Sequence, residues 1–231
     1  MLTGTLYALA AGLMWGMVFV APLLLPNYPP ALQSVGRYLA FGLIALPIAW
    51  LHRDARQGFE VACFQPAGRG YVISGSTSAV EDGEAWIVSY EIRLDRAWRT
   101  RSARITGRSE LGARRTRLDA DGLGHWQVDG AAASHLDGCL DVDLESSAMT
   151  NTFPVHRMGL GVGARASAPA AYVRARDLSA GRLEQEYVRA CDEGRQQRYD
   201  YAAPVFGFAA RLVYDEAGLV LDYPGIALRA L

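Results

Sequence analysis

Lysine is missing from this sequence, acidic side chains are missing from its first fifth, and that fifth holds a single basic one. All 23 basic residues are arginines, and with 24 acidic residues they give a formal net charge of −1. Proteins that bind nucleic acid usually carry a basic excess on one face. The balanced charge therefore gives no support to a nucleic-acid partner.

Cysteines are few and widely spaced. The three of them, Cys63, Cys139 and Cys191, form no C-x-x-C pattern. An odd number at such distances predicts neither a disulfide framework nor a zinc site. We expect ordinary reduced thiols, no metal and no cofactor.

Residues 1–51 contain one ionisable side chain, Arg37. The uncharged run 2–25 would span roughly 36 Å as a helix, which is enough for the core of a bilayer. A Pro-rich break at 26–30 then separates it from a second apolar run, 31–51. This pattern predicts a transmembrane helical hairpin (domain 1–51) followed by a water-soluble domain (52–231). A cleaved signal peptide is the alternative, because residues 8–10 imitate a cleavage site, but no basic region precedes the apolar run.

The charges that follow the second run indicate the orientation. His52, Arg53 and Arg56 come directly after it, whereas the turn between the two runs is uncharged. Basic residues beside a membrane span favour the cytoplasmic side. We therefore expect the inner (cytoplasmic) membrane, with the soluble domain facing the cytoplasm. Small residues in the first run would allow helices to pack closely, including those of a homo-oligomer.

The N-terminal stretch resembles a transporter family. Tyr-Ala-Leu-Ala-Ala-Gly-Leu-Met-Trp-Gly at 7–16 and Gly-Arg-Tyr at 36–38 are similar to the start of an EamA-type drug/metabolite transporter. That resemblance implies about ten helices in two repeats, but no third apolar run follows residue 51. Two helices cannot enclose a substrate site between repeats, so we carry over the topology and no transport residues.

The remainder of the chain has the alternation of β-strands. In residues 86–94, Trp86, Val88 and Tyr90 alternate with polar positions, and residues 206–214 repeat the pattern before a second short run at 219–223. Asp-Gly pairs at 121, 129 and 137 mark turns, with a short strand around Trp126 between the first two. The pattern predicts an antiparallel β domain. The Gly/Ala-rich stretch 161–171 is expected to be a loop.

Enzyme motifs are weak in this domain. No G-x-S-x-G elbow accompanies the histidines, and the Gly-x-Gly-x-Gly stretch at 159–163 lacks the context of a nucleotide loop. Asp141 and Asp143 alternate on one predicted strand, where they could form an acid/base pair or hold a hard cation. They could equally be solvated or paired with arginine.

A second resemblance covers most of the chain. It rests on Trp-Gln-Val-Asp-Gly at 126–130, Leu-Asp-Gly-Cys-Leu-Asp-Val-Asp-Leu at 136–144, Thr-Asn-Thr-Phe-Pro-Val-His-Arg-Met at 150–158, Gln-x-Tyr at 185–187, and Gly-Leu-Val-x-Asp-Tyr-Pro at 218–224. From about residue 58 to the C-terminus, these motifs resemble the putative glycolipid-binding family of small bacterial proteins. The resemblance implies a mainly β fold, a curved antiparallel spiral β-roll or half-barrel, and no catalytic residue.

These observations predict a membrane-tethered domain that binds a glycolipid or another amphiphilic lipid without catalysis. Aromatic rings with polar tips suit such ligands. The ligand contacts expected from the motif match are Trp126, Asp143, Asn151, Arg157, Gln185, Tyr187 and Tyr201. An apolar groove lined by Tyr187, Tyr201 and Phe208 would favour binding, and a filled interior would indicate an ordinary core. Two alternatives remain open. One is a truncated transporter fused to an unrelated domain, and the other is an enzyme that acts on a glycan or lipid headgroup through Asp141 and Asp143.

Overall fold

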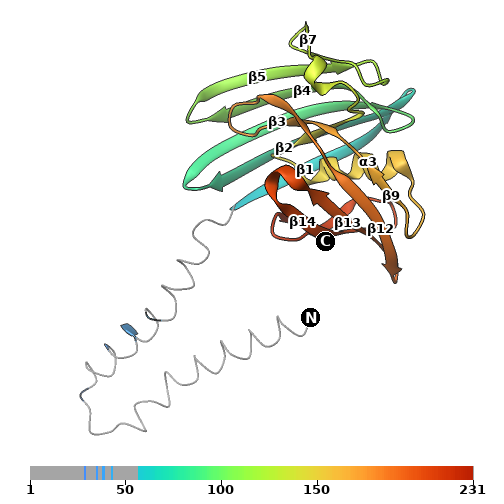
Figure 1. Ribbon diagram of the computed structural model, residues 1–231. Helices are drawn as coiled ribbons and strands as arrows, with labels where there is room; N and C mark the ends of the chain where they lie inside the picture. The colour runs from blue at the N-terminus through green and yellow to red at the C-terminus, as the bar shows by residue number, and fades with distance from the viewer. Residues whose placement is uncertain (1–28, 30–34, 36–37, 40–42, 44–56, 231) are drawn as a thin grey trace. The chain divides into compact units, whose positions relative to one another are not determined.

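The computed structural model describes residues 29, 35, 38, 39, 43 and 57–230 (Figure 1). The hairpin predicted at 2–25 and 31–51 lies outside these residues, apart from four isolated positions, and stays a prediction. Within the described part of the chain, no helix has the length and apolar character needed to cross a membrane. The chain divides into two compact units, Met1–Ala55 and Arg56–Leu231. The second unit is the one described below.

A seven-stranded antiparallel meander forms the first half of this unit. Its strands pair in sequence order: β1 (Gln57–Ala67), β2 (Gly70–Glu81), β3 (Glu84–Asp95), β4 (Thr100–Ser109), β5 (Gly112–Ala120), β6 (Trp126–Val128) and β7 (Ala131–Ala132). Alternate side chains point to opposite faces of a strand. Trp86, Val88 and Tyr90 of β3 are accordingly buried, while Ile87 and Ser89 between them are exposed. The alternation predicted for 86–94 is confirmed.

Two further sheets follow. The three-stranded sheet has the order β11 (Ala180–Leu183), β10 (Ala170–Val173), β8 (Asp141–Leu144). The six-stranded sheet has the order β16 (Ala227–Leu228), β15 (Val220–Tyr223), β14 (Phe208–Tyr214), β13 (Gln196–Ala203), β12 (Glu186–Glu193), β9 (Arg165–Ser167). Its β12–β13 and β13–β14 pairs are antiparallel, as is the expected terminal pair β14–β15.

Short helical elements connect the sheets. These are η1 (Ser134–Leu136), η2 (Ala148–Asn151), α3 (Thr152–Met158) and η3 (Pro204–Phe206). Helix α3 ends at Gly159, whose left-handed φ of 53° lets its N–H bond the carbonyl oxygen of Val155. Phe153 packs in the core under the meander, whereas Val155 packs in the core of the six-stranded sheet. The helix therefore contributes to both hydrophobic cores, and in Figure 1 it lies between β1–β5 and β12–β14.

The comparison with the sequence predictions is mixed. The mainly β class, the antiparallel sheets and the short strand at Trp126 are confirmed. The prediction of a loop at 161–171 is wrong, because that stretch contains β9 and the start of β10. Small alanine and serine side chains give little hydrophobic alternation, so these strands left no clear pattern. One pair departs from the antiparallel expectation, since β8 and β10 are parallel.

Candidate functional site

Strand β8 places two carboxylates in the interior. The Thr100 side chain accepts from the Val142 amide at 3.0 Å, and the Thr100 amide donates to the Leu140 carbonyl at 2.9 Å, which fixes β8 against the start of β4. All four β8 residues are buried, and Asp141 and Asp143 are only 1% and 8% exposed. Neither aspartate is solvated. Two charges so close in the interior need specific partners.

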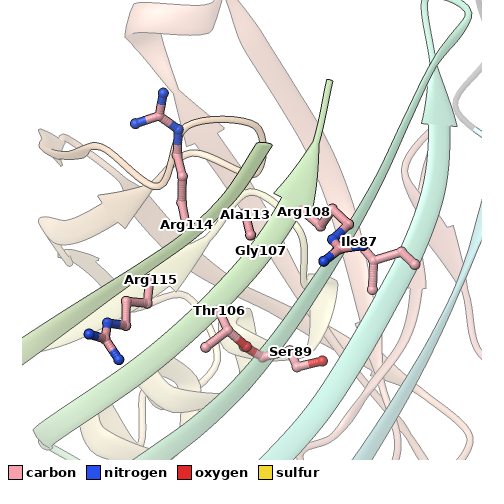
Figure 2. Close-up of a pocket in the computed structure, with 8 residues that line it drawn as sticks. All are labelled: Ile87, Ser89, Thr106, Gly107, Arg108, Ala113, Arg114 and Arg115. Carbon is pink, nitrogen blue, oxygen red and sulfur yellow. The ribbon is translucent and has the colours of Figure 1, made fainter. Parts of the chain in front are cut away.

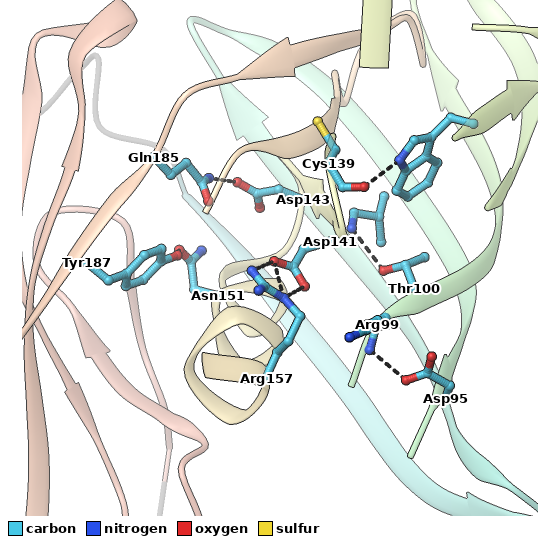
Figure 3. Close-up of polar contacts among 12 residues, drawn as sticks. Asp95, Arg99, Thr100, Cys139, Asp141, Asp143, Asn151, Arg157, Gln185 and Tyr187 are labelled. Atoms are coloured by element: carbon cyan, nitrogen blue, oxygen red, sulfur yellow. Dashed lines mark hydrogen bonds and ion pairs between the residues drawn. The ribbon is translucent and has the colours of Figure 1, made fainter. Parts of the chain in front are cut away.

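Asp141 has an ionic partner on α3. The Arg157 guanidinium donates from Nε at 3.0 Å and from Nη2 at 2.6 Å, a bidentate arrangement that Figure 3 shows. Burial raises the pKa of Asp141, and the guanidinium opposes that rise. Of the interpretations left open above, the arginine-paired carboxylate is the one observed. Across the described residues, no three His, Cys, Asp or Glu side chains gather as a metal site would require.

Asp143 has neutral partners instead. Thr150 Oγ1 donates to Oδ1 at 2.7 Å. Gln185 Nε2 donates to Oδ2, as Figure 3 shows. Burial raises the pKa of Asp143 to about 6, because the two donors only partly replace the lost water. The neighbouring acids Asp141 and Glu145 raise it further. Asp143 is therefore a buried hydrogen-bonding group whose charge changes near neutral pH.

A second hydrogen bond lies beside this carboxylate. Tyr187 donates its hydroxyl to Asn151 Oδ1 at 2.7 Å, and Asn151 follows Thr150 directly in the chain. We call Asp143, Thr150, Asn151, Gln185 and Tyr187 the Asp143 cluster. Each of these side chains is no more than 8% exposed. The cluster joins β8 of the three-stranded sheet, the short helix η2, and the start of β12 in the six-stranded sheet.

Tyrosine rings of the six-stranded sheet surround the cluster. The Tyr187 ring lies 5.1 Å from that of Tyr201 and 6.5 Å from that of Tyr199, measured between centroids. Tyr201 continues to Tyr223 at 5.8 Å and to Phe208 at 6.2 Å. Tyr187 and Tyr201 are both buried. The interior is therefore filled at the place where a groove would have favoured binding.

One border of the cluster reaches the surface. Tyr172 of β10 is the ladder partner of Asp143, and it is half-buried. Its ring lies 5.5 Å from that of Phe206, which is 51% exposed in η3 beside the 71% exposed Val205. Two adjoining rings, Phe206 and Tyr172, thus lie between the solvent and strand β10, which pairs with β8 at Asp143.

The seven predicted contact residues do not all meet. Asp143, Asn151, Gln185, Tyr187 and Tyr201 lie together, and Arg157 joins them through Asp141 on the same strand. Trp126 lies in the other core, where its indole N–H donates to the Cys139 carbonyl at 2.8 Å. Sequence reasoning missed Thr150 as a donor and Tyr172 as the ladder partner. Thr150 lies inside the motif at 150–158. Tyr172 left no signal in the sequence, because its position beside Asp143 depends on the parallel pairing of two strands that are distant in sequence.

A third carboxylate, that of Glu60 in β1, is partly buried. Glu60 accepts from the Tyr90 hydroxyl at 2.7 Å and from the Ser147 hydroxyl, and also from the backbone amides of Ala148 and Met149. Burial raises the pKa of Glu60, and these donors oppose the rise. This network ties the first strand to η2. The alternation of apolar and polar residues in the sequence did not reveal this network.

A groove of about 630 Å³ lies on the outward face of the meander, on β3, β4 and β5. Figure 2 shows the residues that line it: Ile87, Ser89, Thr106, Gly107, Arg108, Ala113, Arg114 and Arg115. None of the seven predicted contact residues is among them.

Known proteins resemble two parts of the chain. Residues 47–229 match the family model described as "Putative glycolipid-binding". The crystal structure of a DUF1089 family protein from Pseudomonas aeruginosa has a TM-score of 0.67 and 36% identity, covering 75% of this chain and 92% of that one. A beta-barrel-like DUF1849 protein from Brucella abortus has a TM-score of 0.40 and 12% identity over 72% of this chain and 80% of that one, which is too distant to carry an inference.

The remaining similarity is short. Over 53 residues the chain is 72% identical to "Inner membrane protein YtfF" of Escherichia coli K12. The matched stretch covers 23% of this chain and 16% of that protein. The chain thus spans about a sixth of the length of that relative. The expected EamA-type resemblance stays a prediction.

Proposed function

We propose that this chain, which belongs to the putative glycolipid-binding family, binds a glycolipid or another amphiphilic lipid and does not transform it chemically. The observation that carries the proposal is the Asp143 cluster. It presents a carboxylate, two amides and a hydroxyl beside a wall of tyrosine rings. Sugar hydroxyls need such donors and acceptors, and apolar sugar faces stack on aromatic rings.

The ligand contacts in this proposal are Asp143, Asn151, Gln185, Tyr187 and Tyr201, with Arg157 close by. Because the cluster is buried and its interior is filled, a headgroup reaches it in this proposal only when side chains at the border, Tyr172 and Phe206, move aside. The exposed Phe206 and Val205 are suited to the apolar part of the ligand. Trp126 is a core residue in this proposal, since its indole is already bonded inside the first core.

An enzymatic role for Asp141 and Asp143 has less support. Asp141 is held in a bidentate ion pair, so it is not available as a base or nucleophile without breaking that pair. If the two aspartates did catalyse turnover, replacing both by asparagine would abolish product formation and leave ligand binding intact.

The membrane tether is part of the proposal. The apolar runs at 2–25 and 31–51, which contain a single charged side chain, Arg37, and the similarity to an inner membrane protein support it. An immunoblot of cell fractions tests it, because the intact 231-residue chain should stay in the membrane pellet after carbonate washing. A soluble species of about 180 residues, alone, would instead favour an accidental fusion to a transporter fragment.

Lipid binding is tested on the full chain extracted in polymer-bounded native membrane particles. Mass spectrometry gives the ratio of glycolipid to phospholipid that accompanies the protein. Asp143→Asn should lower this ratio about tenfold, because it removes a charge-assisted acceptor. Asp200→Asn, an exposed aspartate on β13, is the matched control and should leave it unchanged. Equal ratios in all three proteins would contradict the proposed site, and no enrichment over an unrelated membrane protein would contradict the function.

A further inference from the structure

The outward face of the meander exposes large apolar side chains. Phe59 is 66% exposed, Val61 51%, Val80 46% and Ile87 52%. The ladder puts Phe59 opposite Ser78, and Ser78 opposite Ile87, so these side chains share one face of the sheet. Single exposed apolar residues are common, but four on one sheet face form a patch that usually has a partner.

Arginines adjoin this patch on β4 and β5. Arg108 is the ladder partner of Ile87, and Arg115 is the partner of Thr106, which pairs with Ser89. Figure 2 shows the Arg108 side chain beside Ile87, while the guanidinium of Arg115 extends from the other side of the groove. The hydroxyls of Ser89 and Thr106 line the groove between them. The face thus passes from apolar side chains through hydroxyls to guanidinium groups.

These two arginines lack the partners that their neighbours have. Arg104 lies 3.5 Å from Glu91, and Arg117 lies 2.7 Å from Asp119. Within residues 57–230, by contrast, no carboxylate lies within 4.0 Å of Arg108 or Arg115. Three rows of paired residues cross this face of the sheet, through Ile87, Ser89 and Glu91. Glu91 is the one acid in these rows, and their net charge is +3 because they also contain Arg104, Arg108, Arg115 and Arg117.

We propose that this outward face of β1–β5 docks on the surface of a bilayer that contains anionic lipid. Phe59, Val61 and Ile87 enter the headgroup layer, and Arg108 and Arg115 bind lipid phosphates. Guanidinium groups match phosphate geometry, and each basic residue near an anionic leaflet strengthens binding. This surface is separate from the Asp143 cluster.

The position of β1 in the chain also favours a membrane over a soluble anion. Strand β1 starts at Gln57, so only five residues separate it from the end of the second apolar run at 51. An extended linker of that length reaches only about 20 Å. A bilayer that held the run would therefore lie within reach of Phe59 and Val61. In this respect the inference rests on the proposed tether.

Two exposed cysteines provide the test, because one lies on the seven-stranded sheet and the other on the six-stranded sheet. Cys63 of β1 lies on the same outward face as Phe59 and Val61, and Cys191 of β12 lies on the six-stranded sheet; both are exposed. The full chain is reconstituted in nanodiscs of phosphatidylcholine, with or without phosphatidylglycerol. A water-soluble maleimide is then added, and peptide mass spectrometry gives the modification rate of each cysteine.

Docking predicts that phosphatidylglycerol slows the modification of Cys63 about tenfold at low salt and leaves Cys191 unchanged. The protection should disappear in high salt, because exposed charges are screened. Arg108→Gln with Arg115→Gln should also abolish it. The matched control, Arg195→Gln with Arg211→Gln, changes two exposed arginines away from this face, one in the turn between β12 and β13 and one on β14, and should keep the protection.

Equal Cys63 rates in both lipids would overturn the inference. So would protection that survives Arg108→Gln with Arg115→Gln. Protection that rises with the number of chains per disc, whatever the lipid, would identify a second copy of this chain as the occupant and also overturn it. Carbonate extraction reports separately on the tether, so a tethered chain with fully reactive Cys63 would contradict docking alone.

Discussion

In the folded chain, two neutral donors replace the water around the Asp143 carboxylate. The free energy of unfolding depends on pH as a result. Its pKa rises from an ordinary value of 3.8 to about 6 in the folded chain. A carboxyl group with a raised pKa binds more protons in the folded state than in the unfolded state between those two values. The free energy of unfolding therefore falls as pH rises through this window, by at most about 3 kcal/mol for this group.

Asp143→Asn removes that contribution. We expect the variant to gain stability relative to the parent as pH rises from about 4 to about 7, since its amide cannot ionise. Urea unfolding of the full chain in mild detergent at several pH values measures the difference. Asp200→Asn, at an exposed site, is the control. A stability difference between Asp143→Asn and the parent that does not change with pH would contradict the raised pKa.

Gly75 makes room for Tyr90. A Cβ at Gly75 would collide with the Tyr90 hydroxyl and approach the Val61 carbonyl oxygen to 2.7 Å. Gly75→Ala should therefore destabilise the fold by about 1–3 kcal/mol. Gly181→Ala, also in a strand, meets nothing within 4 Å and is the matched control. The same unfolding assay applies, and equal effects of the two substitutions would rule out the close contact.

At the scale of elements, one ion pair fastens α3 to β8. The Arg157 side chain is 14% exposed and the Asp141 side chain 2%, so the pair is largely desolvated. Arg157→Met should lower the free energy of unfolding by about 3–5 kcal/mol, because it leaves a buried charge unpaired. Adding Asp141→Asn should restore much of the loss. The exposed pair of Arg211 and Asp200 provides the comparison, and Arg211→Met should change stability by less than about 1 kcal/mol.

Elements with long alternation could be predicted from the sequence, and the others could not. Strand β3 follows its pattern throughout because large apolar side chains occupy its inward positions. Helix α3 has seven residues, which is too short to establish a helical period, so its motif carried no structural signal. The parallel pairing of β8 with β10 depends on contacts between distant segments, and no local pattern encodes it.

At the scale of the whole molecule, the second unit should fold without the first. Its two hydrophobic cores are built from residues beyond 57. A chain that starts at Arg56 should therefore give a β-type circular dichroism spectrum and a cooperative thermal transition. A disordered spectrum from this shortened chain would contradict the proposed division at about residue 52.

The candidate site shows where prediction from sequence stops. Quoted motifs contained Asp143, Asn151 and Tyr187, but only the fold brings them together, because β8, η2 and β12 meet between the sheets. Composition gave no reason to separate Trp126 from the other six predicted residues. Its place in the first core follows from the turn that returns Cys139 to its indole N–H.

The topology also sets the order in which the chain can assemble during translation. Strands β1–β7 each pair with a neighbour in sequence, so the meander can form as soon as it leaves the ribosome. The hydrogen bond between Asp143 and Gln185 joins residues 42 positions apart and must wait for the later strands. We therefore expect nascent chains that end before β12 to hold a folded meander with an incomplete cluster. The surface that we propose to dock on a membrane would then exist before the interior that we propose to receive a ligand.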